Sequence, residues 1–517
     1  MMQTPLVLTN FLKRAESYFA RKTIISRTSP QKIHRLTYGQ WAKRTRRLAD
    51  ALSKLGMTRG KKIGSFAWNQ HRHLEAYFAV PCSGAILHMV NIRLSEEHLI
   101  YIINHAEDEI LMIDVDLLPI IENIAPELKT VKHYIIMTDE DTLPETTLPN
   151  ALSYEDLLAA ADENYEFPED IEEDEPAGMC YTSATTGNPK GVVYSHRGIV
   201  LHSMMLSMSD SMGISERDVV MPIVPMFHAN AWGLPFASVN VGATQVLPGP
   251  QFTSAMQEQE KRERDISSLR AICCGGSASP TRLIRTFEEQ YGIPYIVVYG
   301  MTETTPIVAL SNYMSWMDEW PIEKRIESRA MQGMTMAGIE SSIINDSGEV
   351  PWDGETMGEL RLRGPWISHE YYRDERTNDA YRDGWLYTGD IAVRTEDGFI
   401  KITDRTKDLI KSGGEWISSV DLENALMTHD AVLEAAVIAI PHIKWQERPL
   451  ACVVLKEGMA ASEEELLAFL ESQFAKWWVP DDVVFLDEIP KTSVGKFLKA
   501  KLRDNVTEIY PKLASFV

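Results

Sequence analysis

The sequence is poor in basic residues relative to acidic ones. Lys and Arg together number 51 against 74 Asp and Glu, which gives a formal net charge of -23. A nucleic-acid-binding protein presents a basic face, and an anionic membrane surface attracts clusters of Lys and Arg. The charge balance therefore argues against nucleic acid and against an anionic membrane as the main partner. Its simplest interpretation is a surface that keeps the protein in solution.

Cysteine motifs and long apolar runs are also lacking. The five cysteines include no C-x-x-C pair, so we expect no tetrahedral metal site and interpret them as free thiols in a reducing compartment. No uncharged apolar stretch reaches the roughly 20 residues that span a membrane. Residues 1–22 contain no small-residue cleavage site of a signal peptide. These absences predict a cytoplasmic protein without a transmembrane segment.

The chain does have the length and the hydrophobic content for a large core. Its 517 residues, 44% of them hydrophobic, suggest two to four domains. From about residue 40, helix-like and strand-like patterns alternate: a helix over 37–56 that stops at Gly56, a strand over 61–68, and a helix that runs into a second strand over 71–91. This alternation predicts parallel sheets covered by helices.

Two later regions indicate how the chain is divided. Residues 162–175 hold nine acids in fourteen positions, which is typical of a solvated loop and predicts a mobile linker. Near the C-terminus, strand-like runs over 431–442 and 447–455 precede an amphipathic helical pattern over 462–478. We expect a small separate α+β domain after about residue 404.

The stretch YTSATTGNPKGVVYSHRG, residues 181–198, is rich in hydroxyl groups. Ser and Thr hydroxyls can donate to anionic oxygens, and Gly187 and Gly191 permit unusual backbone conformations. Pro189 fixes a turn, and Lys190 adds a positive charge. These residues suit a loop that holds phosphate groups, although the Walker spacing is absent. Taken alone, the stretch could equally be a polar surface turn.

Further motifs follow this loop in a fixed order. They are YGMTET (299–304), GELRLRGP (358–365), YTGD (387–390), DRTKDLIKSGGEWIS (404–418) and PKTSVGKFLK (490–499). With the loop they make the whole chain resemble the acyl-adenylate-forming superfamily of acyl-CoA synthetases, peptide-synthetase adenylation domains and luciferases. Within it, PMFHANAWGLPF (225–236) and KSGGEWISSVDLENAL (411–426) are most similar to fatty-acyl-CoA synthetases.

The resemblance implies a fold and an activity. The fold is α/β: a large N-terminal AMP-binding domain over 1–404, with helix-covered, mostly parallel sheets and a small β-barrel, then a mobile α+β domain over 405–517. The activity is an ATP-dependent acid–thiol ligase that uses Mg²⁺ and CoA. It converts a fatty or other carboxylic acid to acyl-AMP and then to acyl-CoA, with release of pyrophosphate and AMP. A homodimer is compatible with it.

The resemblance also assigns roles at the nucleotide. Glu303 and Thr182 would hold Mg²⁺, and Thr302 would bond the adenylate. Adenine would be contacted by Gly276, Tyr299 and Gly300, and the ribose hydroxyls by Asp390 and Arg405. The phosphates would be held by the residues of the loop: Thr182, Ser183, Thr185, Thr186, Gly187 and Lys190. The plain alternatives are a helix-capping Thr-Glu pair at Glu303 and a surface ion pair between Asp390 and Arg405.

Other roles fall on the C-terminal domain and the acyl pocket. Lys496 would bridge the substrate carboxylate and the α-phosphate. Lys407 would be the hinge, and Lys411 and Trp416 would contact the nucleotide phosphate and the adenylate or pantetheine. The path for CoA would be formed by Ser412, Gly413 and Gly414. The acyl tunnel would be lined by His228 and Trp232. His228 could instead be a core histidine, Trp232 could simply pack, and the HRH triplet at 71–73 is interpreted as a helix face rather than a metal site.

Two departures from the family pattern stand out. Ala184 replaces a usual glycine, which requires an L-compatible backbone there. After Pro250 the family expects a helix, a strand and a helix, but here only 251–274 fill the gap, and the charged QEQEKRERD cannot be a buried strand. A strand–helix unit near 251–270 is apparently missing from the acyl-pocket wall. Two alternatives therefore stay open: transfer of the acyl group to a carrier protein, and an inactive ligand-binding relative.

Overall fold

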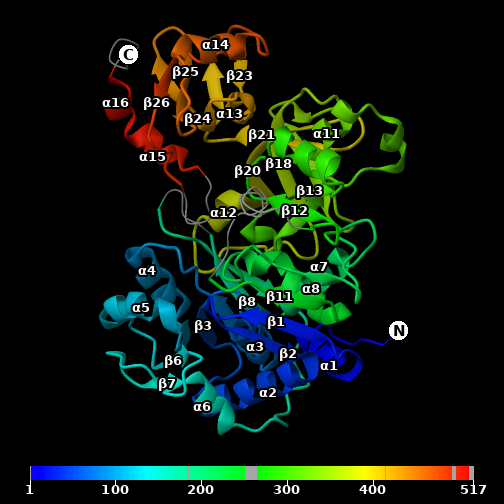
Figure 1. Ribbon diagram of the computed structural model, residues 1–517, viewed down its shortest axis with the longest axis vertical. Helices are drawn as coiled ribbons and strands as arrows, with labels where there is room; N and C mark the ends of the chain where they lie inside the picture. The colour runs from blue at the N-terminus through cyan, green and yellow to red at the C-terminus, as the bar shows by residue number, and fades with distance from the viewer. Residues whose placement is uncertain (1, 183–186, 251–264, 414, 492–496, 512–517) are drawn as a thin grey trace.

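The computed structural model describes the chain except residues 1, 183–186, 251–264, 414, 492–496 and 512–517. Figure 1 shows the N-terminal strands and helices in blue and cyan, the middle of the chain in green and yellow, and the C-terminal part as the orange and red unit at the opposite end. Within the described residues, no helix combines the length and apolar character needed to cross a membrane.

A seven-stranded sheet organises the first part of the chain, in the order β7-β6-β5-β3-β4-β8-β9. All neighbours are parallel except β8 and β9, which are antiparallel. The strands are β3 (Lys62–Phe66), β4 (Ile86–Met89), β5 (Ile110–Asp114), β6 (His133–Met137), β7 (Ala151–Ser153), β8 (Pro176–Tyr181) and β9 (Gly191–Ser195). The expected helix-covered parallel sheet is confirmed.

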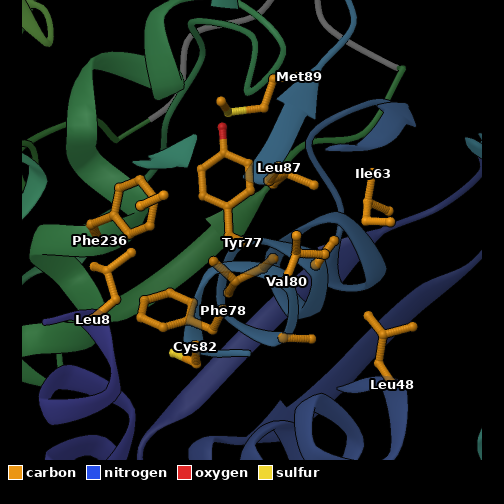
Figure 2. Packing of buried hydrophobic residues seen from close by; sticks show 14 of the residues in the cluster. Leu8, Leu48, Ile63, Tyr77, Phe78, Val80, Cys82, Leu87, Met89 and Phe236 are labelled. Atoms are coloured by element: carbon orange, nitrogen blue, oxygen red, sulfur yellow. The ribbon is translucent and has the colours of Figure 1, made fainter. Parts of the chain in front are cut away.

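Helices cover both faces of this sheet. One face packs on a core formed mainly with α1 (Leu8–Tyr18), α2 (Tyr38–Lys54) and α3 (His71–Cys82). Figure 2 shows this core, with Tyr77 and Phe78 of α3 beside Phe236 and Leu8. The opposite face packs on α4 (Glu96–Ala106) and α5 (Leu118–Ile124). The short α6 (Tyr154–Ala159) follows β7 and contacts α2.

The local signals explain α2 and α3. Thr37 and Gln40 form a capping box at the start of α2, and Gly56 just beyond its end has a left-handed φ of 97°. Every residue of α3 is buried, so the HRH triplet is not a solvent-facing helix face. His73 bonds Ser65 at 3.0 Å, and the described residues contain no cluster of metal-binding side chains. The triplet is therefore part of the core.

Two separate four-stranded sheets follow, with the orders β10-β11-β1-β2 and β12-β13-β14-β15. The first has β1 (Thr23–Arg27), β2 (Ile33–Thr37), β10 (Val219–Val220) and β11 (Thr244–Leu247); the second has β12 (Ile272–Gly275), β13 (Tyr295–Gly300), β14 (Ile307–Leu310) and β15 (Met334–Thr335). Their helices are α7 (His196–Leu206), α8 (Leu234–Val241), α10 (Thr281–Arg285) and α11 (Ile322–Ala330). Among the described strands, β10 and β12 each pair on one side only.

An antiparallel sheet forms the expected small barrel-like unit. Its order is β17-β16-β18-β20-β19, and β21 pairs with β20. The elements are β16 (Glu340–Asn345), β17 (Gly348–Glu349), β18 (Gly358–Arg363), α12 (Thr377–Ala380), β19 (Tyr381–Arg382), β20 (Trp385–Arg394) and β21 (Ile400–Arg405). The proposed domain boundary at residue 405 coincides with the end of β21.

The C-terminal part has its own sheet, β23-β22-β25-β24 with β26 beside β25. Its elements are β22 (Ile410–Ser412), β23 (Glu415–Ile417), α13 (Ser419–Thr428), β24 (Val432–His442), β25 (Gln446–Leu455), α14 (Glu463–Glu471), β26 (Asp482–Phe485), α15 (Lys499–Asp504) and α16 (Val506–Ile509). The helix expected over 462–478 ends at Glu471. Beyond it, Phe474 and Trp478 stack and pack on the core instead.

The acidic block 162–175 is a loop, as expected, but it is anchored. Phe167 and Ile171 are 7% and 2% exposed, so the loop carries its own core contacts. Arg59 pairs with Asp170 and Glu175. These contacts fix the loop against the first sheet, which corrects the expectation of a mobile linker.

Candidate active site

The site lies where β12 and β13 end side by side. These strands are parallel, with Gly275 opposite Val298, so their carboxyl ends meet at one edge. A Cβ at Gly275 would clash with the carbonyl oxygen of Val298, and one at Gly300 would clash with that of Pro306. Gly276, next after β12, has a φ of 90°. At Gly275 and Gly300 this edge therefore has room for backbone only. It is the edge at which we predict that Gly276, Tyr299 and Gly300 meet the adenine.

Three predicted residues come together beside this edge. The Tyr299 hydroxyl donates to Asp390 Oδ2 at 2.5 Å, and Arg405 Nε lies 2.8 Å from Asp390 Oδ1. Asp390 is only 3% exposed, whereas the Arg405 side chain is 46% exposed, so the pair lies at the boundary between the buried carboxylate and the surface. Asp390 raises the pKa of the Arg405 guanidinium, and burial raises that of the Tyr299 hydroxyl. Asp390 is thus held as a buried carboxylate by donors on both sides.

A second cluster begins four residues after Tyr299. Glu303, 4% exposed, accepts from the Tyr371 hydroxyl at 2.6 Å, and Lys190 Nζ donates to the same hydroxyl at 2.7 Å. Lys190 Nζ lies 3.9 Å from Glu303 Oε1. The neighbouring Thr302 is 8% exposed, and its carbonyl accepts from the Tyr194 hydroxyl. Glu303 therefore faces a cation and a donor rather than capping a helix.

The phosphate loop is closed at its base by the pairing of its two ends. The backbone N–H of Lys190 donates to Thr182 Oγ1 at 3.1 Å, and the N–H of Thr182 donates to the Lys190 carbonyl at 2.9 Å. Gly187 has a φ of 70° and open space around it. Burial lowers the pKa of Lys190. Ser183, Thr185 and Thr186, and the departure at Ala184, lie outside the described residues.

Of the two predicted acyl residues, His228 precedes a left-handed turn and Trp232 is part of it. His228 is half-buried, and from Ala229 to Gly233 every φ is positive, between 44° and 74°. Asn230 is 1% exposed, and within the part of the chain that the structure describes neither its amide nitrogen nor its amide oxygen has a partner. Trp232 is half-buried and packs against a buried apolar cluster that includes Leu206 of α7 and Ala237 of α8. Asn230 tolerates this conformation well, but Ala and Trp do not.

The predicted C-terminal residues gather around β22 and β23. Lys411 Nζ lies 4.7 Å from the centre of the Trp416 ring. Ser412 accepts from Arg448 at 3.2 Å, and a Cβ at Gly413 would lie 2.8 Å from the Trp445 ring. Figure 1 places β23 in the orange unit, apart from the green β12 and β13. Lys407 is exposed in the turn after β21. Gly414 and Lys496 lie outside the described residues.

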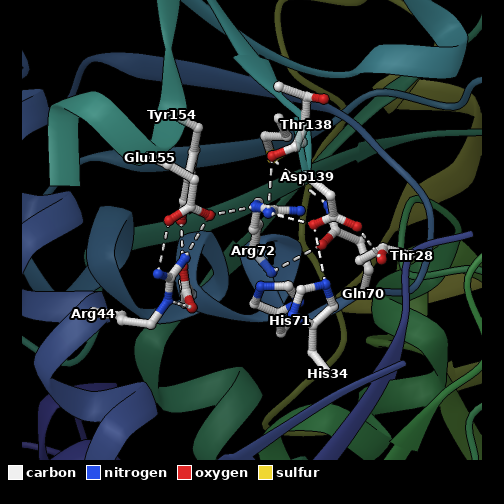
Figure 3. A network of polar contacts seen from close by, with 12 residues as sticks. Thr28, His34, Arg44, Gln70, His71, Arg72, Thr138, Asp139, Tyr154 and Glu155 are labelled. Atoms are coloured by element: carbon white, nitrogen blue, oxygen red, sulfur yellow. Dashed lines mark hydrogen bonds and ion pairs between the residues drawn. The ribbon is translucent and has the colours of Figure 1, made fainter. Parts of the chain in front are cut away.

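A further network of buried charges lies away from these clusters. In Figure 3, Arg72 bridges Glu155 and Asp139, and Arg44 reaches Glu155. Beside it, Asp114 accepts from the backbone N–H of Trp68 at 2.8 Å and from Gln70 at 2.6 Å. Burial raises the pKa of Asp114 to about 7.

Sequence analysis missed Tyr371. It lies within none of the quoted motifs, and its partner Lys190 is 181 positions away. The signal that could have pointed to it is the doubled tyrosine in SHEYYRDERT, between the GELRLRGP and YTGD motifs.

The fold and the two clusters place the motif residues Tyr299, Glu303, Asp390 and Lys190 around the carboxyl ends of β12 and β13. The chain belongs to the AMP-binding enzymes: that family matches residues 11–257 and 250–372, and the AMP-binding enzyme C-terminal domain matches 421–496. The resemblance found in the motifs, the predicted fold class and the prediction of an adenylate-forming enzyme are confirmed.

Relatives match over the whole chain. A long-chain-fatty-acid–CoA ligase of Thermus thermophilus is 45% identical over 99% of this chain and 97% of its own length. A medium-chain-fatty-acid–CoA ligase of Ectopseudomonas oleovorans is 38% identical, over 100% and 99%. A 3-methylmercaptopropionyl-CoA ligase of Ruegeria lacuscaerulensis is 41% identical, over 98% of each. The crystal structure of an anthranilate CoA ligase with anthranoyl-AMP superposes with a TM-score of 0.85 at 25% identity, over 100% of this chain and 99% of that one.

These alignments bear on the apparently missing unit. The alignment with the Thermus thermophilus ligase extends over 537 positions, 20 more than this chain has residues, so it contains gaps in this chain. The family match breaks into two parts that meet at 250–257. The shortening after Pro250 stays a prediction.

Proposed function

We propose that this protein is a fatty-acid–CoA ligase that works through acyl-AMP. The observation that carries the proposal is the pair of clusters four residues apart on YGMTET: Tyr299 with Asp390 and Arg405, and Glu303 with Lys190. One cluster suits ribose hydroxyls, because a buried carboxylate accepts hydrogen bonds from vicinal hydroxyls. The other suits phosphates, because it offers the Lys190 ammonium as a positive charge beside the Tyr371 hydroxyl.

The reaction has two displacement steps. A carboxylate oxygen of the acid attacks the α-phosphorus of ATP, and pyrophosphate leaves. The CoA thiol then attacks the acyl carbonyl of acyl-AMP, a proton is lost from sulfur, and AMP leaves. In the first step the chain mainly positions its substrates and stabilises charge. Lys190 would neutralise the leaving phosphates, and Lys496 would approach the attacking carboxylate.

Mg²⁺ fits the oxygen donors at this site. A hard cation prefers carboxylate and hydroxyl oxygens, and Glu303 and Thr182 supply them on either side of Lys190. When bound, the ion would neutralise charge on the phosphate oxygens. The chain's own contribution is to hold the Glu303 carboxylate in place through Tyr371.

The acyl group would lie beside His228 and Trp232. The apolar residues packed around Trp232 suit a hydrocarbon chain, and two relatives are named for fatty acids. The shortened segment after Pro250 would remove part of the pocket wall. We therefore expect a preference for fatty acids but weak discrimination of chain length.

The test measures products with ATP, Mg²⁺, CoA and saturated fatty acids of increasing length. We expect AMP and acyl-CoA in equal amounts, and pyrophosphate release only when an acid is present. Lys496→Ala should slow acyl-AMP formation by about 10²–10³-fold, because it removes one charge aimed at the transition state. Thioester formation from supplied acyl-AMP should persist. Pyrophosphate release that ignores the acid, or transfer to a carrier protein but not to CoA, would contradict the proposal.

A further inference from the structure

Tyr371 lies at the centre of the phosphate-side cluster. Its side chain is 3% exposed, and its hydroxyl accepts from Lys190 at 2.7 Å while it donates to Glu303 at 2.6 Å. The Lys190 ammonium also lies 3.9 Å from the centre of the Tyr371 ring. One hydroxyl thus bridges the cation and the carboxylate that face each other here.

Residues 366–377, which we call the Tyr371 segment, fix this hydroxyl. The Tyr371 N–H donates to Thr377 Oγ1 at 3.0 Å, and its ring packs edge-on against Tyr381 at 5.4 Å. Because ring and backbone are both held, the hydroxyl has little freedom to move.

The same segment is tied to both sides of the site. Ser368 N–H donates to the Glu303 carbonyl at 2.9 Å. Tyr372 N–H donates to the Gly191 carbonyl at 2.8 Å, and Arg376 donates to the Asn188 carbonyl at 3.0 Å. The segment therefore connects the end of the phosphate loop to the stretch that carries Glu303.

We propose that Tyr371 is a positioning residue that keeps Lys190 and Glu303 apart and oriented for the nucleoside triphosphate. This inference rests on the proposed function. Lys190 and Glu303 form a long ion pair at 3.9 Å, and without the hydroxyl between them the two charges would close to hydrogen-bonding distance. Binding of the β- and γ-phosphates would then have to break that pair first.

The position of Tyr371 predicts that its loss affects the binding of ATP but not the binding of AMP. AMP lacks the phosphates that Lys190 faces, and its adenosine would meet the Tyr299 and Asp390 cluster instead. Tyr371→Phe should therefore weaken ATP binding in the presence of Mg²⁺ by about 10- to 100-fold, the usual effect of one hydrogen bond to a charged group. It should leave AMP binding unchanged and raise the Mg²⁺ concentration needed for half-maximal ATP binding.

Tyr372→Phe is the matched control. Tyr372 is the next residue in the chain, and its buried hydroxyl has no hydrogen-bond partner among the described residues. Its removal should change neither ATP nor AMP binding. Thr377→Val is a second probe, because it keeps the Tyr371 hydroxyl but removes the acceptor of its backbone N–H; a smaller, ATP-specific loss is expected.

The experiment is calorimetric titration of the full-length protein and the three variants with ATP and with AMP, at several Mg²⁺ concentrations, with melting temperatures measured alongside. Single-turnover assays add a second readout: Tyr371→Phe should slow acyl-AMP formation but not thioester formation from supplied acyl-AMP. Unchanged ATP binding, or equal losses for ATP and AMP, would overturn the role of Tyr371. Failure of the wild-type protein to bind ATP would instead refute the proposed function.

Discussion

Four successive non-glycine residues, Ala229 to Trp232, have left-handed backbone conformations. Such a conformation costs an L-residue about 1–2 kcal/mol because Cβ approaches the following carbonyl. Glycine escapes this cost. We expect Ala231→Gly to change the free energy of unfolding by less than about 1 kcal/mol, since the relieved strain offsets the lost buried methyl, worth ~0.8 kcal/mol.

Ala237 provides the comparison. It is equally buried but lies in the right-handed α8. Ala237→Gly loses a methyl and gains the helix penalty of glycine, so it should cost about 2 kcal/mol. Urea unfolding of both variants gives the two values. Equal destabilisation would mean that the turn stores no strain.

Asp114 predicts a dependence of stability on pH. Burial raises its pKa to about 7 in the folded protein, above its ordinary value near 4. Between these values the folded state holds a proton that the unfolded state has lost. The contribution of Asp114 to the free energy of unfolding is thus present at low pH and is lost as the pH rises from about 4 to 7, by up to roughly 1.4 kcal/mol per pH unit.

Asp114→Asn removes this titration and keeps the shape of the side chain. Urea unfolding of both proteins at several pH values measures the difference. Relative to the wild-type protein, the variant should gain stability as the pH rises through this range. Parallel pH profiles would show that Asp114 is ionised throughout.

At the scale of elements, the turn after β21 governs how the two parts of the chain can move. Lys407 is exposed there, between Arg405, which holds Asp390, and β22, which carries Lys411. If the C-terminal part rotates between the half-reactions with Lys407 as the hinge, the backbone dihedral angles of Lys407 must change. Lys407→Pro fixes φ near -65° and should keep acyl-AMP formation while it loses most thioester formation.

Lys407→Ala is the control for this prediction. It removes the charged side chain but leaves the backbone free, so both half-reactions should persist. Single-turnover measurement of each half-reaction, with folding checked by circular dichroism, gives the answer. Normal thioester transfer in the proline variant would exclude Lys407 as the hinge.

The sequence predicts elements whose signals are local. The start and stop of α2 follow from Thr37, Gln40 and Gly56, and the contiguous YGMTET motif leads directly to Tyr299 and Glu303. The rest depends on contacts between distant segments. Tyr371 meets Lys190 only because the Tyr371 segment crosses the phosphate loop, and no periodicity encodes that crossing.

Backbone chirality is a second limit. The left-handed turn at 229–233 contains a single glycine, so the usual signal of positive φ is missing. Likewise, the amphipathic pattern over 462–478 continues past the end of α14, because Phe474 and Trp478 face the same core from irregular backbone. Tertiary packing decides both cases.

At the scale of the whole molecule, the segment after Pro250, which we predict to be shortened, lies in the sequence between the strands of two sheets. Arg270, just before β12, pairs with Asp218, just before β10, at 2.9 Å, so the two strands begin near each other. Val219 and Met221 on the β10 side are 67% and 49% exposed. A further parallel strand between β10 and β12 would cover these side chains.

Insertion of the corresponding segment of the Thermus thermophilus ligase between Pro250 and Asp265 tests this arrangement. The insertion should raise the melting temperature and sharpen the preference for long acids, because each buried methylene is worth ~0.8 kcal/mol. We expect kcat/KM to rise by about tenfold per two carbons in the insertion variant and much less in the wild-type protein.

A Gly/Ser insertion of equal length controls for length alone, since such a segment forms no strand. It should leave both the melting temperature and the chain-length profile as they are. If the wild-type protein already shows the steep profile, its acyl pocket is complete without the segment.

The one-sided pairing of β10 has a consequence for how copies of the molecule meet. A strand edge with exposed apolar side chains is a template for pairing between chains, but the net charge of -23 makes the molecules repel one another. Salt shortens the range of that repulsion to about 3 Å at 1 M and leaves apolar contact intact. The protein should therefore be colloidally stable in dilute buffer and self-associate as salt is added. Light scattering across a salt series would show it, and a flat response would mean that the edge is covered.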